Sequence, residues 1–294
     1  GIIASFEDLT HIWDSTEDVE PAADHNELFT DLHEYRNHSG VDDSPEVQNL
    51  LKEYQDKKYI KIFESYQAAV KYVGADLILS KILLIEMNKF DAASSSVIKR
   101  LRTVLDFASS GITDATELRY KTELPKAVDA IADALDLMTQ CGPDEQLELL
   151  VLDVVDAFWL IPTKMCERRF MATQVKNRYI IFERTAQGSR SASLSFCTFI
   201  GLVGRCVQSL FYLPALDESG ARSPFDLCMQ IYIDDPLSVL KGTPYKRDLA
   251  VCVLIAAKLA LGLPLAFHKA KRGQELPWIG VTLSINQSRA HMDA

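Results

Sequence analysis

Two short segments place acidic side chains at the ends of apolar runs. Asp153 lies toward the end of the apolar run 147–155, and the pair Asp234 and Asp235 directly follows the run 229–233. A charge at the edge of a β core is costly unless it is paired or bound to a metal. Two adjacent carboxylates repel each other, and a hard divalent cation removes that repulsion. The pattern therefore suggests a magnesium site if the two segments lie side by side.

The chemistry of such a site would be phosphoryl transfer. Mg²⁺ binds through a few carboxylates together with substrate phosphates. Two such ions about 4 Å apart would hold the attacking and leaving oxygens of an in-line displacement. Each segment alone also has a simpler interpretation. Asp234-Asp235 suits a tight turn between two strands, because aspartate tolerates left-handed backbone geometry, and Asp153 could simply end a strand.

The surrounding sequence predicts a mixed chain in which helices and strands do not alternate strictly, which is typical of the α+β class. The predicted strands cover 82–87, 101–107, 147–155, 169–175, 179–182, 229–233, 237–240 and 278–285. The predicted helices cover 46–73, 125–139, 191–212 and 248–261. Residues 1–45 are polar and acidic, and we expect them to be loosely ordered or to form one marginal helix.

Composition and charge exclude several classes of protein. The 294 residues are 48% hydrophobic and 24% charged, which rules out a disordered or fibrous chain. The longest apolar stretch is interrupted by a lysine, a glycine and a proline, so no membrane partner is expected. The net charge is −10, but residues 1–60 hold 15 acidic and 4 basic residues, so 61–294 carry 26 acidic and 27 basic, a net of +1. That part can still present a basic groove to nucleic acid.

The six cysteines form no C-x-x-C pair and mostly lie in apolar runs. They are expected to be free thiols of an intracellular protein, in the cytoplasm or the nucleus. The chain begins with glycine, and we expect it to be a fragment or a processed product of a longer chain.

Six segments, taken in order, resemble the motifs of reverse transcriptases. The segment from Asp153 to Pro162 resembles motif A, 186–189 resembles motif B, and Tyr232 to Asp235 is similar to the Tyr-x-Asp-Asp box of motif C. Lys269 and 278–280 resemble motifs D and E, and 99–107 resembles the fingers segment that precedes the palm. Over roughly 75–285 the chain is therefore similar to the RNA-directed DNA polymerase domain of a retroelement polyprotein.

The resemblance implies a right-hand polymerase with fingers and palm, an antiparallel palm sheet backed by helices, and a thumb that is largely missing. The implied divisions are an acidic, partly disordered or linker segment at 1–60, fingers at 61–146, a palm with motifs A to E at 147–288 and a tail at 289–294. Integrase and RNase H domains would be upstream and downstream parts of the polyprotein and are absent from this sequence. The partners would be an RNA or DNA template with a primer, and dNTPs.

The resemblance also implies the metal ligands. Asp153, Asp234 and Asp235, together with the backbone carbonyl of Val154, would hold two Mg²⁺ ions, for which Mn²⁺ could substitute. Lys269 would donate a proton to the pyrophosphate leaving group. Lys271 is an alternative donor, and either lysine could equally be an ordinary surface residue.

The remaining roles concern the nucleotide and the primer. Phe158 would lie beneath the sugar and exclude the 2′-hydroxyl of an rNTP, although by itself it could be a core residue. The other implied nucleotide-binding residues are Lys99, Arg102, Asp156, Ala157, Gln187 and Gly188. The implied primer or template contacts are Tyr232, Trp278 and Gly280. A basic cluster at 164–184 would contact template phosphates, or would be a solvated hairpin face.

Two departures from the family pattern support a rival hypothesis. Pro236 directly follows the aspartate pair and cannot donate a ladder hydrogen bond, and Ala186 stands where the family often has proline. A non-catalytic remnant that keeps the fold and binds nucleic acid is therefore the first alternative. A palm polymerase that uses rNTPs is the second.

Overall fold

The computed structural model describes residues 22–91, 96–117, 122–211, 226–286 and 289–293. The chain folds as two compact units, each assembled from two separate stretches. The first unit comprises Gly1–Lys121 and Phe158–Ser195, and the second comprises Thr122–Ala157 and Phe196–Ala294. These bounds differ from the expected divisions at residues 60, 146 and 288, because the chain returns to the first unit after it has begun the second.

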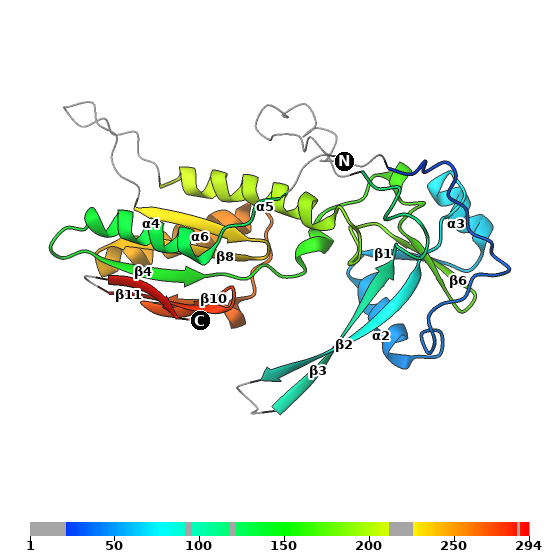
Figure 1. Cartoon of the computed structure of the whole chain (residues 1–294), viewed down its shortest axis with the longest axis horizontal. Helices are drawn as coiled ribbons and strands as arrows, with labels where there is room; N and C mark the ends of the chain where they lie inside the picture. The colour runs from blue at the N-terminus through cyan, green and yellow to red at the C-terminus, as the bar shows by residue number, and fades with distance from the viewer. Residues whose placement is uncertain (1–21, 92–95, 118–121, 212–225, 287–288, 294) are drawn as a thin grey trace. The chain divides into compact units, whose positions relative to one another are not determined.

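Among its described residues, the first unit contains helices α2 and α3, a three-stranded sheet and a two-stranded ribbon. The sheet has the antiparallel order β1-β6-β5, and β2 pairs with β3 along a long ribbon (Figure 1). The elements are α2 (Pro45–Asp56), β1 (Ile60–Phe63), α3 (Tyr66–Val73), β2 (Lys81–Asp91), β3 (Ser96–Asp106), η3 (Met165–Glu167), β5 (Ala172–Val175) and β6 (Arg178–Phe182). The predicted hairpin of β5 and β6 is confirmed.

The single helix predicted over 46–73 is wrong. The segment forms α2 and α3 with β1 between them, because Ile60 to Phe63 pair with β6. Lys58, with φ 60°, takes the left-handed conformation that ends the first helix, and Ser65 caps the second by accepting from the Ala68 N–H. The helical spacing of apolar residues in 46–54 does not reveal that a strand follows.

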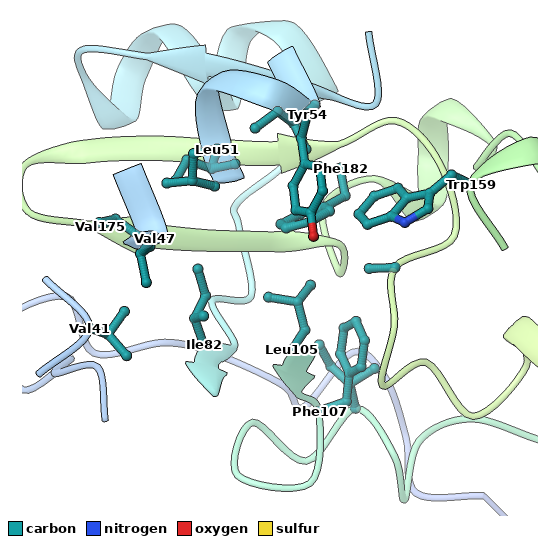
Figure 2. Packing of buried hydrophobic residues seen from close by; sticks show 14 of the residues in the cluster. Val41, Val47, Leu51, Tyr54, Ile82, Leu105, Phe107, Trp159, Val175 and Phe182 are labelled. Atoms are coloured by element: carbon teal, nitrogen blue, oxygen red, sulfur yellow. The ribbon is translucent and has the colours of Figure 1, made fainter. Parts of the chain in front are cut away.

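Buried side chains from most elements of the first unit meet in one core (Figure 2). Its labelled members are Val41, Val47, Leu51, Tyr54, Ile82, Leu105, Phe107, Trp159, Val175 and Phe182. The acidic segment contributes to this unit from residue 22 onward, since Val41 is 3% exposed and Tyr35 Oη donates to Ser80 O at 3.0 Å. This differs from the expected linker over the described residues 22–60, while residues 1–21 lie outside the described part.

The second unit contains a four-stranded and a three-stranded antiparallel sheet. Their orders are β7-β8-β4-β9 and β10-β11-β12. The elements are α4 (Ala127–Thr139), β4 (Gln146–Val151), β7 (Leu227–Tyr232), β8 (Asp235–Gly242), α6 (Pro244–Ala260), η4 (Phe267–Lys269), β9 (Lys271–Gly273), β10 (Glu275–Trp278), β11 (Val281–Asn286) and β12 (Arg289–Asp293). Helix α5 (Ala192–Ser209) continues from the first unit into the second, and η2 (Ala157–Leu160) begins in the second.

Helices cover the larger sheet. Helix α4 places Ala130, Ala134 and Leu137 in a buried cluster with side chains of β4 and β8, and α6 packs against β8 (Figure 1). Gly204 of α5 packs closely against β7, because a Cβ there would lie 2.2 Å from Ile231 Cδ1 and would require that side chain to shift. Thus the expectation of an antiparallel sheet backed by helices is confirmed.

Two predictions near the C-terminus are wrong. The single strand predicted over 278–285 is a hairpin, because Ile279 (φ 43°) and Gly280 (φ 85°) form a two-residue turn with both residues left-handed. Residues 289–293 of the expected tail instead form β12, which pairs with β11. A β-branched residue such as Ile279 gives no sequence signal for this turn.

Across the described residues, no helix is long and apolar enough to cross a membrane. All six cysteines are free thiols.

Candidate catalytic site

The two acidic segments meet at one end of the larger sheet. Strand β4 pairs antiparallel with β8 as far as Val151 and Leu237. Beyond that point the Val154 N–H donates to Asp234 O at 3.0 Å. The backbone beside Asp153 is thereby tied to the aspartate pair that lies more than 80 residues further along the chain.

A third segment fixes Asp153 from its other side. The Ala266 N–H donates to Asp153 O, and the Val155 N–H donates to Pro264 O, each at 2.9 Å. Val154 also forms an isolated antiparallel bridge with Leu265. Sequence reasoning missed this supporting segment, because three residues after a helix carry no detectable strand pattern.

The carboxylates influence one another electrostatically. Burial raises the pKa of Asp235, and the negative charges of Asp153 and Asp234 raise it further. Lys271 and Lys269 oppose this effect through their positive charges. The negative charges of Asp153, Asp234 and Asp235 therefore repel one another, and a bound cation would relieve that repulsion.

The two oxygens of Asp153 have different surroundings. The carboxylate is 17% exposed, and its Oδ2 accepts a hydrogen bond from Lys269 Nζ. Its Oδ1 is buried and has no hydrogen-bond partner among the described residues. A buried carboxylate oxygen without a donor is costly, and a metal ion would satisfy it.

The fit to a divalent cation is incomplete in this arrangement. Over the described ranges, no group of three or more histidine, cysteine, aspartate or glutamate side chains is placed so that it could hold a metal ion. Lys269 instead occupies one oxygen of Asp153. The lone Oδ1 and the mutual repulsion at Asp235 fit a cation, and the ligand set of Asp153, Asp234, Asp235 and Val154 stays a prediction.

The aspartate pair lies at a tight turn between β7 and β8, but the left-handed residue of that turn is Ile233 and not an aspartate, as the simpler interpretation supposed. Tyr232 pairs with Asp235, which leaves Ile233 and Asp234 as the two turn residues. Ile233 has φ 52°, an unfavourable region for a β-branched side chain. Such strain often accompanies a functional site, so the turn and the site are compatible interpretations.

Pro236 accounts for the early end of β4. Its carbonyl accepts from the Leu152 N–H at 3.3 Å, but it has no N–H to return a bond. The ladder therefore stops at Val151, and the strand predicted over 147–155 is too long. The returning strand β8 itself begins regularly at Asp235.

Five further predicted residues lie in the same unit. Trp278 is 1% exposed, and its Nε1 donates to Asp235 O at 2.9 Å, so this core residue also supports the aspartate pair. Tyr232 is half-buried and packs against the buried cluster formed by α4 and the two sheets. Gly280 lies in the β10–β11 turn. Asp156, with φ 53°, and the buried Ala157 follow Val155.

The nucleotide-binding predictions fall mainly in the first unit. Arg102 is exposed on β3 opposite Ile85, and the backbone of Lys99 pairs with Asn88, while the Lys99 side chain lies outside the described part. Phe158 is half-buried, and its carbonyl accepts from Thr185 Oγ1 and from the Ile161 N–H.

The predicted motif B segment is fixed against β3. The Leu105 N–H donates to Gln187 O at 3.0 Å. Gly188 has φ 101°, and a Cβ there would lie 2.2 Å from Leu105 O. Only glycine fits this close approach.

Part of the predicted basic cluster serves internal contacts. Arg168 Nη1 donates to Glu183 Oε1 at 2.6 Å, and Arg178 Nη2 donates to Gln48 Oε1. Lys176 stays exposed at the tip of the β5–β6 hairpin.

Comparison with known proteins gives a likeness of fold. No protein-family model matches the chain, and no curated protein matches it. A foamy viral protease–reverse transcriptase, solved in complex with double-stranded DNA, has a similar structure with a TM-score of 0.58 and 13% sequence identity. The similarity covers 100% of this chain and 44% of that chain. The protein therefore has a reverse-transcriptase-like fold and spans less than half the length of that relative.

Proposed function

We propose that the chain is the RNA-directed DNA polymerase domain of a retroelement, which adds dNTPs to a primer 3′-hydroxyl under the direction of a template. The observation that carries the proposal is the hydrogen bond from Val154 to Asp234, which brings the Asp153 segment to the aspartate pair. The reverse-transcriptase-like fold supports it. In this proposal the β7-β8-β4-β9 sheet is the palm, and the first unit provides the fingers.

The acidic residues would position the reacting groups. Asp153, Asp234 and Asp235, with the carbonyl of Val154, would hold the two divalent ions, Mg²⁺ or Mn²⁺. When bound, these ions would lower the pKa of the primer hydroxyl and neutralise the triphosphate. The Trp278 indole and the Val154 N–H keep the aspartate pair in place through its backbone carbonyls. Catalysis would come from positioning and charge stabilisation.

Lys269 would have two successive partners. Without substrate, its ammonium group is bound to Asp153. Once Asp153 binds a cation, Lys269 would be released toward the pyrophosphate leaving group, where it could donate a proton. Replacing Lys269 by Ala should then lower the extension rate by about 10²-fold or more, while replacing Lys271 should have the smaller effect.

Nucleotide binding would fall to residues of the first unit and to the end of motif A. Arg102 is exposed and would bind the triphosphate, with Lys99 beside it on the same strand. Phe158 would lie beneath the sugar, after Asp156 and Ala157. Gln187 and Gly188 would contact the nucleotide and its template partner. Tyr232 and the Trp278–Gly280 turn would steady the primer.

A catalytically decayed remnant is the second candidate. The ion pair of Lys269 with Asp153 favours it, because it neutralises the carboxylate that the reaction needs. The end of the β4 ladder beside Pro236, which cannot donate the return hydrogen bond, favours it as well. In this alternative the fold persists and binds nucleic acid without chemistry.

Primer extension on an RNA template separates the two candidates. The wild-type chain should extend a DNA primer with dNTPs in Mg²⁺ or Mn²⁺, and Asp235→Asn should lose at least about 10³-fold of that activity. Asp144→Asn is the matched control, since Asp144 is an exposed aspartate of the same unit before β4. A folded wild-type chain that extends nothing with either ion would leave the remnant as the correct assignment.

A further inference from the structure

Beyond its first turn, helix α6 is apolar on nearly every side, which is unusual for a helix at a protein surface. From Leu249 to Leu261 its one charged residue is Lys258, which is 2% exposed. The buried side chains Ala250, Leu254 and Lys258 lie on the inner face. A helix that is apolar all round is normally covered on all sides. The outer face of α6 is nevertheless open.

Five exposed residues of α6 form a regular stripe on its outer face, and Lys246, Asp248 and Ala260 are exposed as well. The five residues of the stripe are Tyr245 (76% exposed), Leu249 (52%), Cys252, Ala256 and Leu259 (47%). Their intervals are four, three, four and three residues, which is the spacing along the seam between two packed helices. The stripe therefore suits another helix better than a loop or a strand.

Charges do not interrupt the stripe. Near the start of the helix, Lys246 Nζ lies 2.8 Å from Glu145 Oε1, and Asp248 Oδ1 lies 2.7 Å from Arg272 Nη2. Both charged side chains are thus engaged within the same unit. Two chains that each carry a net charge of −10 could therefore meet here without placing like charges together.

The order of side-chain sizes in the stripe is the same from either end. Leu249, Cys252, Ala256 and Leu259 read large, small, small, large. If two copies of the helix pack antiparallel through this stripe, Leu249 lies against Leu259 of the partner subunit. Cys252 then lies against Ala256 of the partner subunit. Tyr245 would then lie just beyond the end of the partner helix, beside Gly262 of the partner subunit, where no side chain stands. A two-fold axis requires such a self-complementary surface.

We propose that the outer face of α6 is the contact surface of a homodimer in which the two α6 helices pack antiparallel. The small residues in the middle allow a close approach of the helices, and the opposed helix dipoles favour this direction. This inference does not depend on the proposed polymerase function.

The first test is the mass of the 294-residue chain in solution, measured by light scattering over a dilution series. The wild type should be a dimer that dissociates on dilution. Leu249→Glu should raise the dissociation constant at least about tenfold, because each copy would bury an unpaired charge. Leu202→Glu is the matched control, because Leu202 is a 48% exposed leucine on α5, and it should stay dimeric. Thermal melting would confirm that both variants fold.

The second test determines direction and register. Ala256→Cys should give a covalent dimer on mild oxidation, through Cys252 of the partner subunit, and Ala256→Cys combined with Cys252→Ser should not. A wild type that is monomeric at every concentration would overturn the proposal, whether the stripe is covered by another part of the chain or left open. Equal effects of the two glutamate variants would also overturn it. A dimer without the cross-link would refute the antiparallel register.

Discussion

Lys258 carries its ammonium group into the interior of the second unit. The residue is 2% exposed, its Nζ has no hydrogen-bond partner among the described residues, and burial lowers its pKa from 10.5 to about 8. A buried amine of this kind destabilises the fold whenever it must be protonated. Because the folded-state pKa lies below the unfolded one, this cost is fully present below about pH 8 and disappears as the pH rises toward 10.5.

Lys258→Met should therefore stabilise the protein at neutral pH. The free energy of unfolding at pH 7 should rise by about 3 kcal/mol at most, following about 1.4 kcal/mol per pKa unit. The free energy of unfolding of the wild type should increase between pH 8 and pH 10, and this increase should be absent from the variant. Urea unfolding at pH 7 and pH 10 measures both effects. Identical pH profiles for the wild type and the variant would contradict the unpaired burial of this amine.

Phe158 tests the sugar selection that the sequence register implies. The ring is half-buried, and its place five residues after Asp153 is what assigns it beneath the sugar. Phe158→Ala should raise rNTP incorporation relative to dNTP incorporation by about tenfold or more, since the steric exclusion of the 2′-hydroxyl is lost. Competition between rNTP and dNTP in primer extension measures the ratio. An unchanged ratio with reduced stability would make Phe158 a core residue only.

At the scale of elements, Gly188 fixes the predicted motif B segment against β3. Gly188→Ala should lower the stability of the first unit by about 2 kcal/mol or more, because the new methyl group would meet Leu105 O in a left-handed backbone. Gly201→Ala on α5 is the control, since its Cβ would meet nothing within 4 Å. Thermal unfolding of the two variants gives the comparison, and equal midpoints would contradict the close approach.

Elements with a strong local pattern could be predicted from the sequence, and those set by pairing could not. Helix α4 and the β5–β6 hairpin follow from their own residues. Strand β1 lies in a segment whose apolar residues have helical spacing, and it is set by its pairing with β6. The turn at Ile279 uses a residue type that normally avoids positive φ. In the candidate site, Asp153 and the aspartate pair could be identified from their positions in the sequence. The support from Ala266 and Trp278 depends on tertiary contacts that no spacing reveals.

For the whole molecule, charge is separated along the chain. Residues 1–60 carry −11 and residues 61–294 carry +1, so the proposed binding of nucleic acid would belong to residues 61–294. The affinity for an RNA–DNA primer duplex should fall linearly with salt on logarithmic axes, with a slope of roughly −0.9 for each phosphate contacted. Fluorescence anisotropy over a salt series measures this slope. Binding that does not change with salt would contradict a phosphate-tracking groove.

The most direct test of the account is Mn²⁺ binding, followed by electron paramagnetic resonance with the primer–template present. The wild type and Asp144→Asn should bind the ion with equal affinity, whereas Asp153→Asn should weaken binding at least about tenfold, because it removes a charged oxygen ligand. If Asp153→Asn binds Mn²⁺ as tightly as the wild type, the three aspartates do not form one cation site, and the catalytic proposal is wrong.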